Sequence, residues 1–319
     1  MKKYLLGVDI GGTTIKMGII SVEGKIIEKW EVTTKTGEES DQIPNDIWNA
    51  LQSKLTTHSI PVEACFGIGV GAPGFVVTDT GEIAQAVNLG WLDFPLGTLL
   101  HDLSNLPVYV ENDANIAALG ENWLGSGDLA ENLVAITLGT GVGGGIIVNG
   151  RIVSGTNGMA GEIGHMTMEK NGVPCNCGRR GCLETITSAT GIARIAQARV
   201  TADSDTELAP LLEKKKKLTA KDVFDATKNN DRVAQEIVAE VVDVLGLAIS
   251  NITTIVNPSK IVIGGGVSKA GEELLKPLKK AFVSYALPRI VESTSFEIAE
   301  LGNDAGIIGG AYLVKQHQS

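Results

Sequence analysis

YLLGVDI, at residues 4–10, runs directly into DIGGTTIKMG, at residues 9–18. The apolar run predicts a buried β-strand, and residues 15–20 and 26–32 predict two further strands that follow it. The chain therefore opens as a hairpin meander. Because Asp9 interrupts the apolar run and no small-residue cleavage site follows, we interpret this segment as a strand and not as a signal peptide.

The second half of the chain repeats this pattern in LVAITLGTGVGGGIIVNGRIV, at residues 133–153. It contains a strand, a glycine-rich turn, a returning strand and then a hairpin turn. Two such halves predict an α/β fold with two related lobes, whose glycine-rich hairpins face each other across a cleft. We place the small lobe at residues 1–120, joined by a C-terminal helix at about 303–319, and the large lobe at residues 121–302.

Apolar periodicity predicts the remaining helices and strands. Helices are expected at residues 43–57, 112–124, 185–200, 219–229 and 231–255, and in NDAGIIGGAYLV near the C-terminus; strands are expected at residues 64–70, 107–111 and 260–264. The longest helix carries an apolar stripe at helical spacing, which predicts that it packs against the core. The polar stretch at residues 201–218 contains Lys214 to Lys217, which we interpret as a solvated loop or helix edge.

Composition indicates a globular protein of two domains. The 319 residues are 43% hydrophobic and 20% charged, and no apolar run is long enough to span a bilayer. The formal net charge of −10 disfavours nucleic acid and anionic membranes as partners. Clustered cysteines that suit a metal, with Cys65 left single, fit a reducing compartment, so we expect a cytoplasmic protein.

Three of the four cysteines and one histidine have the spacing of metal ligands. They are His165, Cys175, Cys177 and Cys182. Glycines inside CNCGRRGC permit the sharp turn that a tetrahedral Zn²⁺ requires, and four protein ligands leave no open coordination position. We therefore predict a structural zinc site and expect the catalytic residues to lie elsewhere in the chain. The alternatives are a chance cluster, or a disulfide with a spare thiol.

Three glycine-rich turns follow apolar strands, in DIGGTTIKMG, in LGTGVGGG at residues 138–145 and in GGGVS at residues 264–268. Such turns expose backbone N–H groups that bind phosphate oxygens, and Asp9 could hold Mg²⁺ through water. None is a P-loop or a dinucleotide fingerprint, and each one alone could be an ordinary hairpin. Their repetition predicts a site for the phosphates of a nucleotide.

Acidic residues provide the candidates for catalysis. ENDAN, at residues 111–115, is a predicted helix start, where Asn112 or Asp113 could cap the helix and Asp113 could also take a proton from a substrate hydroxyl. Glu162 lies three residues before His165, and Glu184 lies two residues after Cys182. A zinc ion would hold both glutamates in place to bind the hydroxyls of a polyol, whereas without it they could be ordinary surface residues.

The chain resembles the ROK family of bacterial sugar kinases and repressors, and most closely its glucokinases, through DIGGTTIK, ENDAN, GTGVGGG, GEIGH and CNCGRRGCLE. The knuckle CxCGxxGCxE, which binds structural zinc in that family, is the most specific of these motifs; hexokinase, actin and Hsp70 folds share the glycine turns. The resemblance implies two ribonuclease-H-like lobes around a central cleft. It also implies ATP and Mg²⁺ in that cleft and phosphorylation of the 6-hydroxyl of a hexose, which for glucose is the first step of glycolysis.

The resemblance further implies a role for each matched position. Asp113 would be the catalytic base. Contacts to the sugar would come from Gly71, Asn88, Asn112, Asp113, Glu162, His165 and Glu184. The nucleotide would be surrounded by Asp9, Gly11, Gly12, Thr13, Thr14, Lys16, Thr140, Gly141, Gly265 and Gly266. Because family members often dimerise, we expect a homodimer or a dimer of dimers.

Other functions remain open from the sequence. The hexose could be fructose, mannose, allose, N-acetylmannosamine or N-acetylglucosamine. A sugar-responsive repressor of the same family would carry an N-terminal helix-turn-helix extension, for which the strand predicted from residue 4 leaves no room. A nucleotide-dependent structural or chaperone protein of the actin and Hsp70 kind would have no need for the zinc knuckle.

Overall fold

The computed structural model describes residues 2–318 and divides into two compact units. The first unit contains the chain up to Leu129, residues 145–161 and the chain from Glu300 onward. The second contains residues 130–144 and 162–299. The chain therefore crosses between the units four times. Residues 145–161, which the sequence grouped with the large lobe, belong by their contacts to the first unit.

The first sheet has the strand order β3-β2-β1-β4-β8. Its strands are β1 (Tyr4–Ile10), β2 (Thr14–Ser21), β3 (Ile26–Thr33), β4 (Cys65–Ala72) and β8 (Val108–Asn112). The first three form the antiparallel meander expected from the sequence, and β1, β4 and β8 run parallel. A small separate sheet contains β5 (Phe75–Val77), β6 (Glu82–Ala86) and β7 (Trp91–Phe94), none of which the sequence predicted.

The second sheet repeats the order of the first, as β11-β10-β9-β12-β13. Its strands are β9 (Leu133–Leu138), β10 (Val142–Val148), β11 (Arg151–Ile152), β12 (Lys260–Gly264) and β13 (Ser295–Ile298). β12 runs parallel to both β9 and β13, and β10 pairs with β11 as an antiparallel hairpin. The similarity of the two hairpin motifs in the sequence therefore corresponds to a repeated sheet topology.

The two faces of β1 pack against different helices. Because successive side chains of a strand point to opposite faces, Leu6, Val8 and Ile10 share one face and Leu5, Gly7 and Asp9 share the other. The first face packs on α1 (Ile43–Thr57) and α2 (Leu96–Ser104) in the larger apolar cluster. The second face meets α11 (Ala305–Gln316), the last helix of the chain. The alternation in YLLGVDI therefore places Asp9 on the side of α11.

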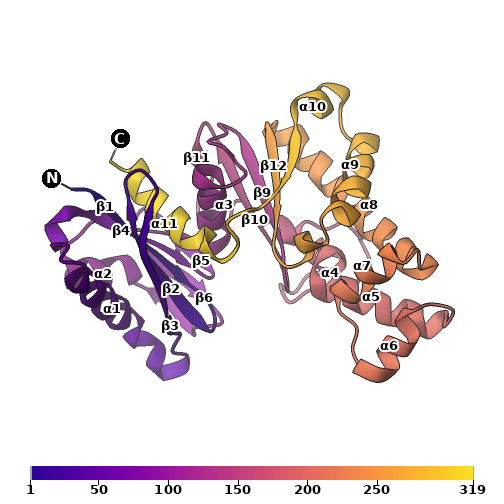
Figure 1. The fold of residues 1–319 in the computed structure, drawn as a ribbon, viewed down its shortest axis with the longest axis horizontal. Helices are drawn as coiled ribbons and strands as arrows, with labels where there is room; N and C mark the ends of the chain where they lie inside the picture. The colour runs from indigo at the N-terminus through magenta and orange to yellow at the C-terminus, as the bar shows by residue number, and fades with distance from the viewer. Residues whose placement is uncertain (1, 319) are drawn as a thin grey trace. The chain divides into compact units, whose positions relative to one another are not determined.

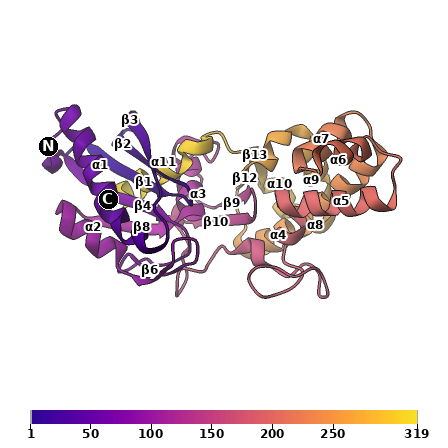
Figure 2. The same cartoon turned by 90° about the horizontal axis from the view of Figure 1, so that it is seen from below.

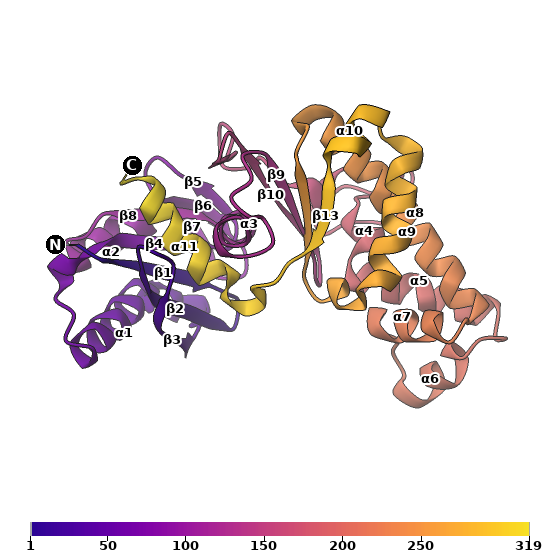
Figure 3. The ribbon, with the colours of Figure 1, turned by 45° about the horizontal axis from the view of Figure 1, so that its top comes forward.

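Glycines allow α11 to touch the backbones around it (Figures 1 and 3). A Cβ atom at Gly7 would lie 1.9 Å from the carbonyl oxygen of Ile307, and one at Gly69 would lie 1.9 Å from that of Gly310. On the other side of α11, a Cβ at Gly309 would lie 1.6 Å from the carbonyl oxygen of Ile116 in α3 (Asp113–Leu124). Strands β1 and β4 and helices α3 and α11 are thus fixed by direct main-chain packing.

Helices make up most of the second unit. They are α4 (Glu184–Thr187), α5 (Ala189–Ala202), α6 (Leu208–Lys215), α7 (Ala220–Lys228), α8 (Arg232–Val256), α9 (Glu272–Tyr285) and α10 (Pro288–Ser293). α5, α7 and α8 pack on one another (Figure 2). Among the described residues only α8 is long and apolar enough to cross a membrane, and most of that stretch is buried inside this unit.

The helix predictions were confirmed for α1, α3, α7, α8 and α11 within two residues at each end. The expected helix at 185–200 is two helices, α4 and α5, and the start of α5 is capped by Ser188. The polar stretch at 201–218 contains α6, and Lys214 to Lys217 are exposed at its C-terminal end. The sequence analysis missed α2, α6, α9, α10 and β13.

Candidate functional site

Asp9 lies where β1 ends, in a crowded environment. Its antiparallel partner across the sheet is Lys16 of β2. The N-terminal turn of α11 presses on its carboxyl, because a Cβ at Gly306 would come within 2.5 Å of its Cγ. Burial raises the pKa of Asp9 from 3.8 to about 6; Lys16 opposes that rise and the charge of Asp113 adds to it. The two carboxyl groups therefore influence each other within the first unit.

The turn between β1 and β2 is held by main-chain hydrogen bonds. The N–H of Gly11 donates to the carbonyl of Thr14 at 3.0 Å, and Thr34 ties the turn through its hydroxyl to the carbonyl of Gly11 at 2.7 Å. Gly12 and Thr13 are exposed. A Cβ at Gly12 would meet no atom within 4 Å, so the fold itself does not require glycine there.

Asp113 begins α3, and its own Oδ1 accepts the N–H of Ala114 at 2.8 Å. The N-cap is Asn112, whose Oδ1 accepts the N–H of Ala114 at 2.9 Å, while its Nδ2 donates to the carbonyl of Gly74 at 3.1 Å. Burial of the Asp113 carboxyl among neighbouring protein atoms raises its pKa, against hydrogen bonds that lower it, although the residue reaches solvent. Asn112 is the N-cap by its backbone position, and Asp113 shares the N–H of Ala114 with it.

Gly71 and Asn88, both predicted to contact sugar, have different surroundings. A Cβ at Gly71 would lie 1.9 Å from Cδ1 of Ile116, so Gly71 lets the start of α3 approach β4. Asn88 is exposed in the turn between β6 and β7. The structure gives Gly71 a packing role, and contact of either residue with a sugar stays a prediction.

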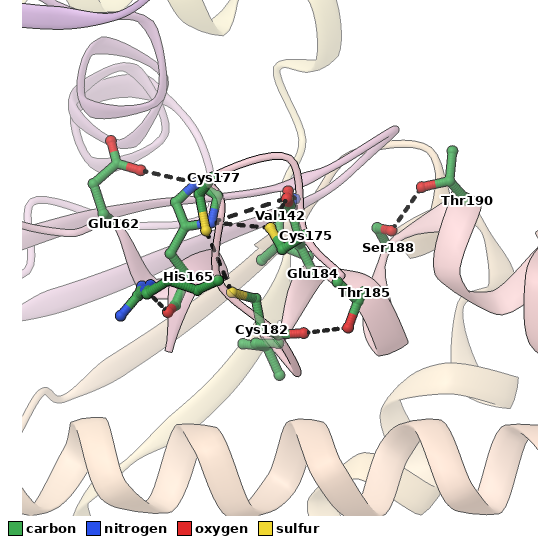
Figure 4. A network of polar contacts seen from close by, with 12 residues as sticks. Val142, Glu162, His165, Cys175, Cys177, Cys182, Glu184, Thr185, Ser188 and Thr190 are labelled. Carbon is green, nitrogen blue, oxygen red and sulfur yellow. Dashed lines mark hydrogen bonds and ion pairs between the residues drawn. The ribbon is translucent and has the colours of Figure 1, made fainter. Parts of the chain in front are cut away.

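The predicted metal ligands converge in the second unit (Figure 4). The donor atoms of His165, Cys175, Cys177 and Cys182 all lie within 4.8 Å of one another. The Sγ atoms of Cys177 and Cys182 are 3.6 Å apart, and Nδ1 of His165 lies 3.7 Å from Sγ of Cys175. Donors around one tetrahedral ion would be separated by about 3.5–3.8 Å, whereas a disulfide needs about 2.05 Å. This cluster can hold a metal ion, and its cysteines are not disulfide-bonded.

Glu184 connects this cluster to the glycine-rich turn after β9 (Figure 4). Its Oε1 accepts from the thiol of Cys175 at 3.1 Å, and its Oε2 accepts the N–H of Val142 at 3.4 Å. A Cβ at Gly141 would lie 2.6 Å from that Oε2, so this glycine makes room for the glutamate. On the other side of the imidazole, Oε2 of Glu162 lies 3.9 Å from Nε2 of His165. Both predicted glutamates therefore lie beside the cluster.

The other predicted glycine-rich turn of the second unit, GGGVS after β12, borders a cavity. Gly265 has φ of +83° and approaches the end of β9, where a Cβ would lie 2.5 Å from the carbonyl oxygen of Leu138. A cavity of about 450 Å³ is lined by Gly266 and Val267, by Ala189 and by α7 residues that include Phe224 and Lys221. The sequence analysis missed the α7 residues, because the helical pattern there is that of an ordinary amphipathic helix.

The structure thus divides the predicted site residues into two groups. The first unit holds Asp9, Gly11, Gly12, Thr13, Thr14, Lys16, Gly71, Asn88, Asn112 and Asp113. The second unit holds Thr140, Gly141, Glu162, His165, Cys175, Cys177, Cys182, Glu184, Gly265 and Gly266. The strand-end carboxylates therefore belong to one unit, and the metal-ligand cluster with its glutamates belongs to the other.

Comparison with known proteins identifies the class. The model of the ROK family matches residues 5–317, so the chain belongs to the ROK family. It is 54% identical to a glucokinase of Halalkalibacterium halodurans, over 99% of this chain and 96% of that protein.

Two solved structures resemble this one and differ in function. A ROK glucokinase of Streptomyces griseus, solved with glucose and AMPPNP, has 32% identity and a TM-score of 0.76, over 98% of this chain and 99% of that one. A ROK transcriptional regulator, described as a homologue of the E. coli MLC protein, has 25% identity and a TM-score of 0.86, over 98% of this chain and 78% of that one. The fold, with two lobes of the actin and hexokinase type, is thus shared by kinases and regulators, so function depends on the site.

Proposed function

We propose that this protein is a glucokinase, which transfers the γ-phosphate of ATP to the 6-hydroxyl of glucose. One observation carries the proposal: Asp113 stands solvent-exposed at the start of α3, next to the N-cap Asn112, and neighbouring protein atoms raise the pKa of its carboxyl. A carboxylate with a raised pKa is a stronger base for a substrate hydroxyl. The 54% identity to a glucokinase over nearly the whole chain supports glucose as the substrate.

In this proposal the chain's own residues bind and orient the reactants. Asp113 accepts the proton of the attacking hydroxyl, and the other sugar contacts come from Gly71, Asn88, Asn112, Glu162, His165 and Glu184. The nucleotide lies along the glycine-rich turns, at Asp9, Gly11, Gly12, Thr13, Thr14, Lys16, Thr140, Gly141, Gly265 and Gly266. The cavity beside Gly266 and Phe224 is large enough for an adenine base and is lined by both apolar and charged residues.

Two metal ions belong to the proposal. Asp9 would hold Mg²⁺, which neutralises phosphate charge during the transfer. The His and Cys cluster would hold a structural Zn²⁺, because its donor set is one that zinc prefers and its donor spacing suits a tetrahedral ion. Arg179 supports this at one ligand, since its backbone N–H and its guanidinium lower the pKa of Cys177 to about 6, which favours the thiolate that zinc binds. Burial raises the pKa of Cys175 and of Cys182, so zinc would have to displace the protons of those two thiols.

We further propose that the two compact units are the two lobes of the kinase, and that the enzyme works in the cytoplasm as a homodimer or a dimer of dimers. The family relationship and the unpaired cysteines support these assignments. Fructose, mannose, allose and the N-acetylated amino sugars remain the competing substrates. Glucose phosphorylation as the first step of glycolysis is the physiological role we assign.

A coupled assay of ADP release tests the function. Purified protein with Mg-ATP would be given glucose, mannose, fructose, N-acetylglucosamine or N-acetylmannosamine in turn. We expect the highest kcat/KM with glucose. A preference for another hexose would keep the kinase and change its substrate, and the absence of turnover with every sugar would refute the kinase function.

A further inference from the structure

Glu111 is a buried carboxylate next to the catalytic segment, and no role has been assigned to it above. It is the last residue but one of β8 and is only 2% exposed. Its Oε1 accepts the N–H of Asn112 at 2.8 Å and Nδ2 of Asn115 at 3.0 Å, and its Oε2 accepts the hydroxyl of Ser154 at 2.6 Å. A carboxylate can be buried only where donors satisfy it, so these three bonds fix their donors strongly.

Two of the three bonds hold the start of α3. The backbone of Asn112 carries the N-cap, and Asn115 lies in the first turn of the helix, so both flank Asp113 in the chain. Oδ1 of Asn115 is buried and has no hydrogen-bond partner among the described residues. The orientation of this amide therefore depends on the hydrogen bond that it donates to Glu111. Because Asn115 lies in the first turn of α3, this bond also ties that turn to the end of β8.

The third bond holds the first residue of a loop. Residues 154–161 follow β11 and lead along the chain to Glu162. The loop closes on itself, since the N–H of Ala160 donates to the carbonyl of Ser154 at 3.1 Å. It also packs on β5, because a Cβ at Gly158 would lie 2.0 Å from the carbonyl oxygen of Val76. Ser154 is thus the anchor of a compact loop that precedes a sugar-binding glutamate.

We infer that Glu111 is a positioning residue that aligns the catalytic base with the sugar. One carboxyl oxygen fixes the start of α3 and hence Asp113, and the other fixes Ser154, the first residue of the loop 154–161 that ends directly before Glu162 in the chain. This inference rests on the proposed glucokinase function. It predicts that Glu111 affects kcat and the KM for glucose together, because it acts on both segments, whereas Ser154 affects only the KM for glucose.

The experiment compares variants of the whole enzyme by steady-state kinetics in the ADP-release assay. Glu111→Gln keeps the size of the side chain, but its one amide oxygen accepts only neutral bonds and its amide nitrogen cannot accept at all, so at least one of the three bonds is lost or reversed. It should lower kcat about tenfold and raise the KM for glucose about tenfold, because small displacements of reacting groups cost much of the rate. The KM for ATP should stay within about twofold, since the hydrogen-bond partners of Glu111 are Asn112, Asn115 and Ser154, which are not proposed nucleotide contacts.

Ser154 separates the two effects. Ser154→Ala should raise the KM for glucose about tenfold while kcat stays within about twofold, because α3 keeps its bonds to Glu111. Ser154→Thr retains the hydroxyl, and the added methyl group has room because Ser154 lines a cavity of about 440 Å³. This variant should therefore recover the wild-type KM.

Asp231→Asn is the matched control for a general loss of stability. The Asp231 carboxylate also accepts three hydrogen bonds, from Ala234, Thr206 and Glu207, but it caps α8 and none of these partners is a proposed substrate contact. This variant should unfold at a lower temperature with kcat and both KM values unchanged.

The possible outcomes are distinct. If Glu111→Gln keeps kcat and the glucose KM within about twofold, or if Ser154→Ala lowers kcat as much as Glu111→Gln does, the inference is wrong. If Glu111→Gln does not fold, an unchanged glucose KM in Ser154→Ala still overturns it. Wild-type protein that phosphorylates no sugar would refute the proposed function instead, so the two failures can be told apart.

Discussion

The carboxylates of the first unit and the metal-ligand cluster of the second unit are both parts of the proposed site, but different forces fix them. Asp9 and Asp113 stand on elements whose backbones touch directly, through glycines of β1, β4 and α11. The cluster stands on a loop whose only regular elements are a 3₁₀ turn at Ile163–His165 and two isolated β-bridges. In that loop the donor atoms of the four predicted metal ligands lie close together although the backbone has little regular structure.

This difference shows two ways of making a site rigid. Close-packed backbones cannot shift without breaking many contacts, so in the first unit main-chain packing, together with the hydrogen bonds at the start of α3, holds the carboxylates. A loop with little secondary structure and few buried apolar residues needs cross-links, and a bound metal ion supplies four of them. The first part should therefore be sensitive to small increases in side-chain volume, and the second to loss of a ligand.

The largest effect is expected at Asp113. Asp113→Ala should lower kcat about 10³- to 10⁴-fold with little change in the KM for glucose or ATP, because a base acts mainly in the transition state. Steady-state kinetics measures this, and glucose binding by calorimetry should remain. An Asp113→Ala enzyme with near wild-type turnover would remove this residue from the role of base.

The packing of α11 should be broken by a single methyl group. Gly309→Ala would place a Cβ atom 1.6 Å from the carbonyl oxygen of Ile116, so α3 and α11 would have to separate. We expect a loss of at least about 3 kcal/mol in the free energy of unfolding, measured by denaturant titration.

Gly12→Ala is the control for that variant. A Cβ at Gly12 meets nothing within 4 Å, and the residue is not in the left-handed region, so stability should change by less than about 1 kcal/mol. Gly12→Ala should instead raise the KM for ATP, because the added methyl group would occupy space that only a bound nucleotide would need. Equal destabilisation by both variants would show that the close contact of Gly309 with Ile116 is not the source of the loss of stability.

Loss of one ligand should disable the second unit's part of the site. Cys177→Ser should release the zinc ion and raise the KM for glucose about tenfold, since Glu162 and Glu184 would lose the fixed neighbour that orients them. Metal analysis of the purified protein gives the stoichiometry. Cys65→Ala, at a buried thiol in β4 of the first unit, should keep its zinc. One zinc equivalent in a fully active Cys177→Ser enzyme would disprove this view of the cluster.

The smallest effect concerns the pH dependence of stability at Asp9. Because its pKa is raised from 3.8 to about 6, the folded state holds the proton more tightly than the unfolded state. The ionised carboxyl therefore destabilises the fold: the penalty is absent below about pH 4, grows as pH rises, and is complete above about pH 6.

Asp9→Asn removes this penalty and should stabilise the protein by about 1 kcal/mol at pH 8, with no gain near pH 4, after allowance for solvent screening. Thermal unfolding at the two pH values measures the difference. Turnover should fall at the same time, because the proposed Mg²⁺ site loses its charge. A gain in stability of the same size at both pH values would show that the charge of Asp9 is not its source.

Much of this architecture could be predicted from the sequence. The apolar runs at residues 4–10 and 133–138, each followed by a glycine-rich turn and a returning strand, indicated the two strand and hairpin repeats, because such patterns are local in the sequence. The four metal ligands could also be identified, since their residue types are few and their spacing is short. The small sheet β5-β6-β7 could not, because its strands are short and become stable only through pairing with one another.

The sequence alone determined which chemical groups the protein carries and in which local elements they lie: the carboxylates after strands, the glycine turns and the four metal ligands. Tertiary structure alone decided the environment of those groups. The N-terminus of α11, almost 300 residues from Asp9, removes water from its carboxyl, and Ser154 satisfies the buried charge of Glu111 from 43 residues away. Burial and hydrogen bonding depend on contacts between distant segments, and these contacts set the pKa and the position of each group.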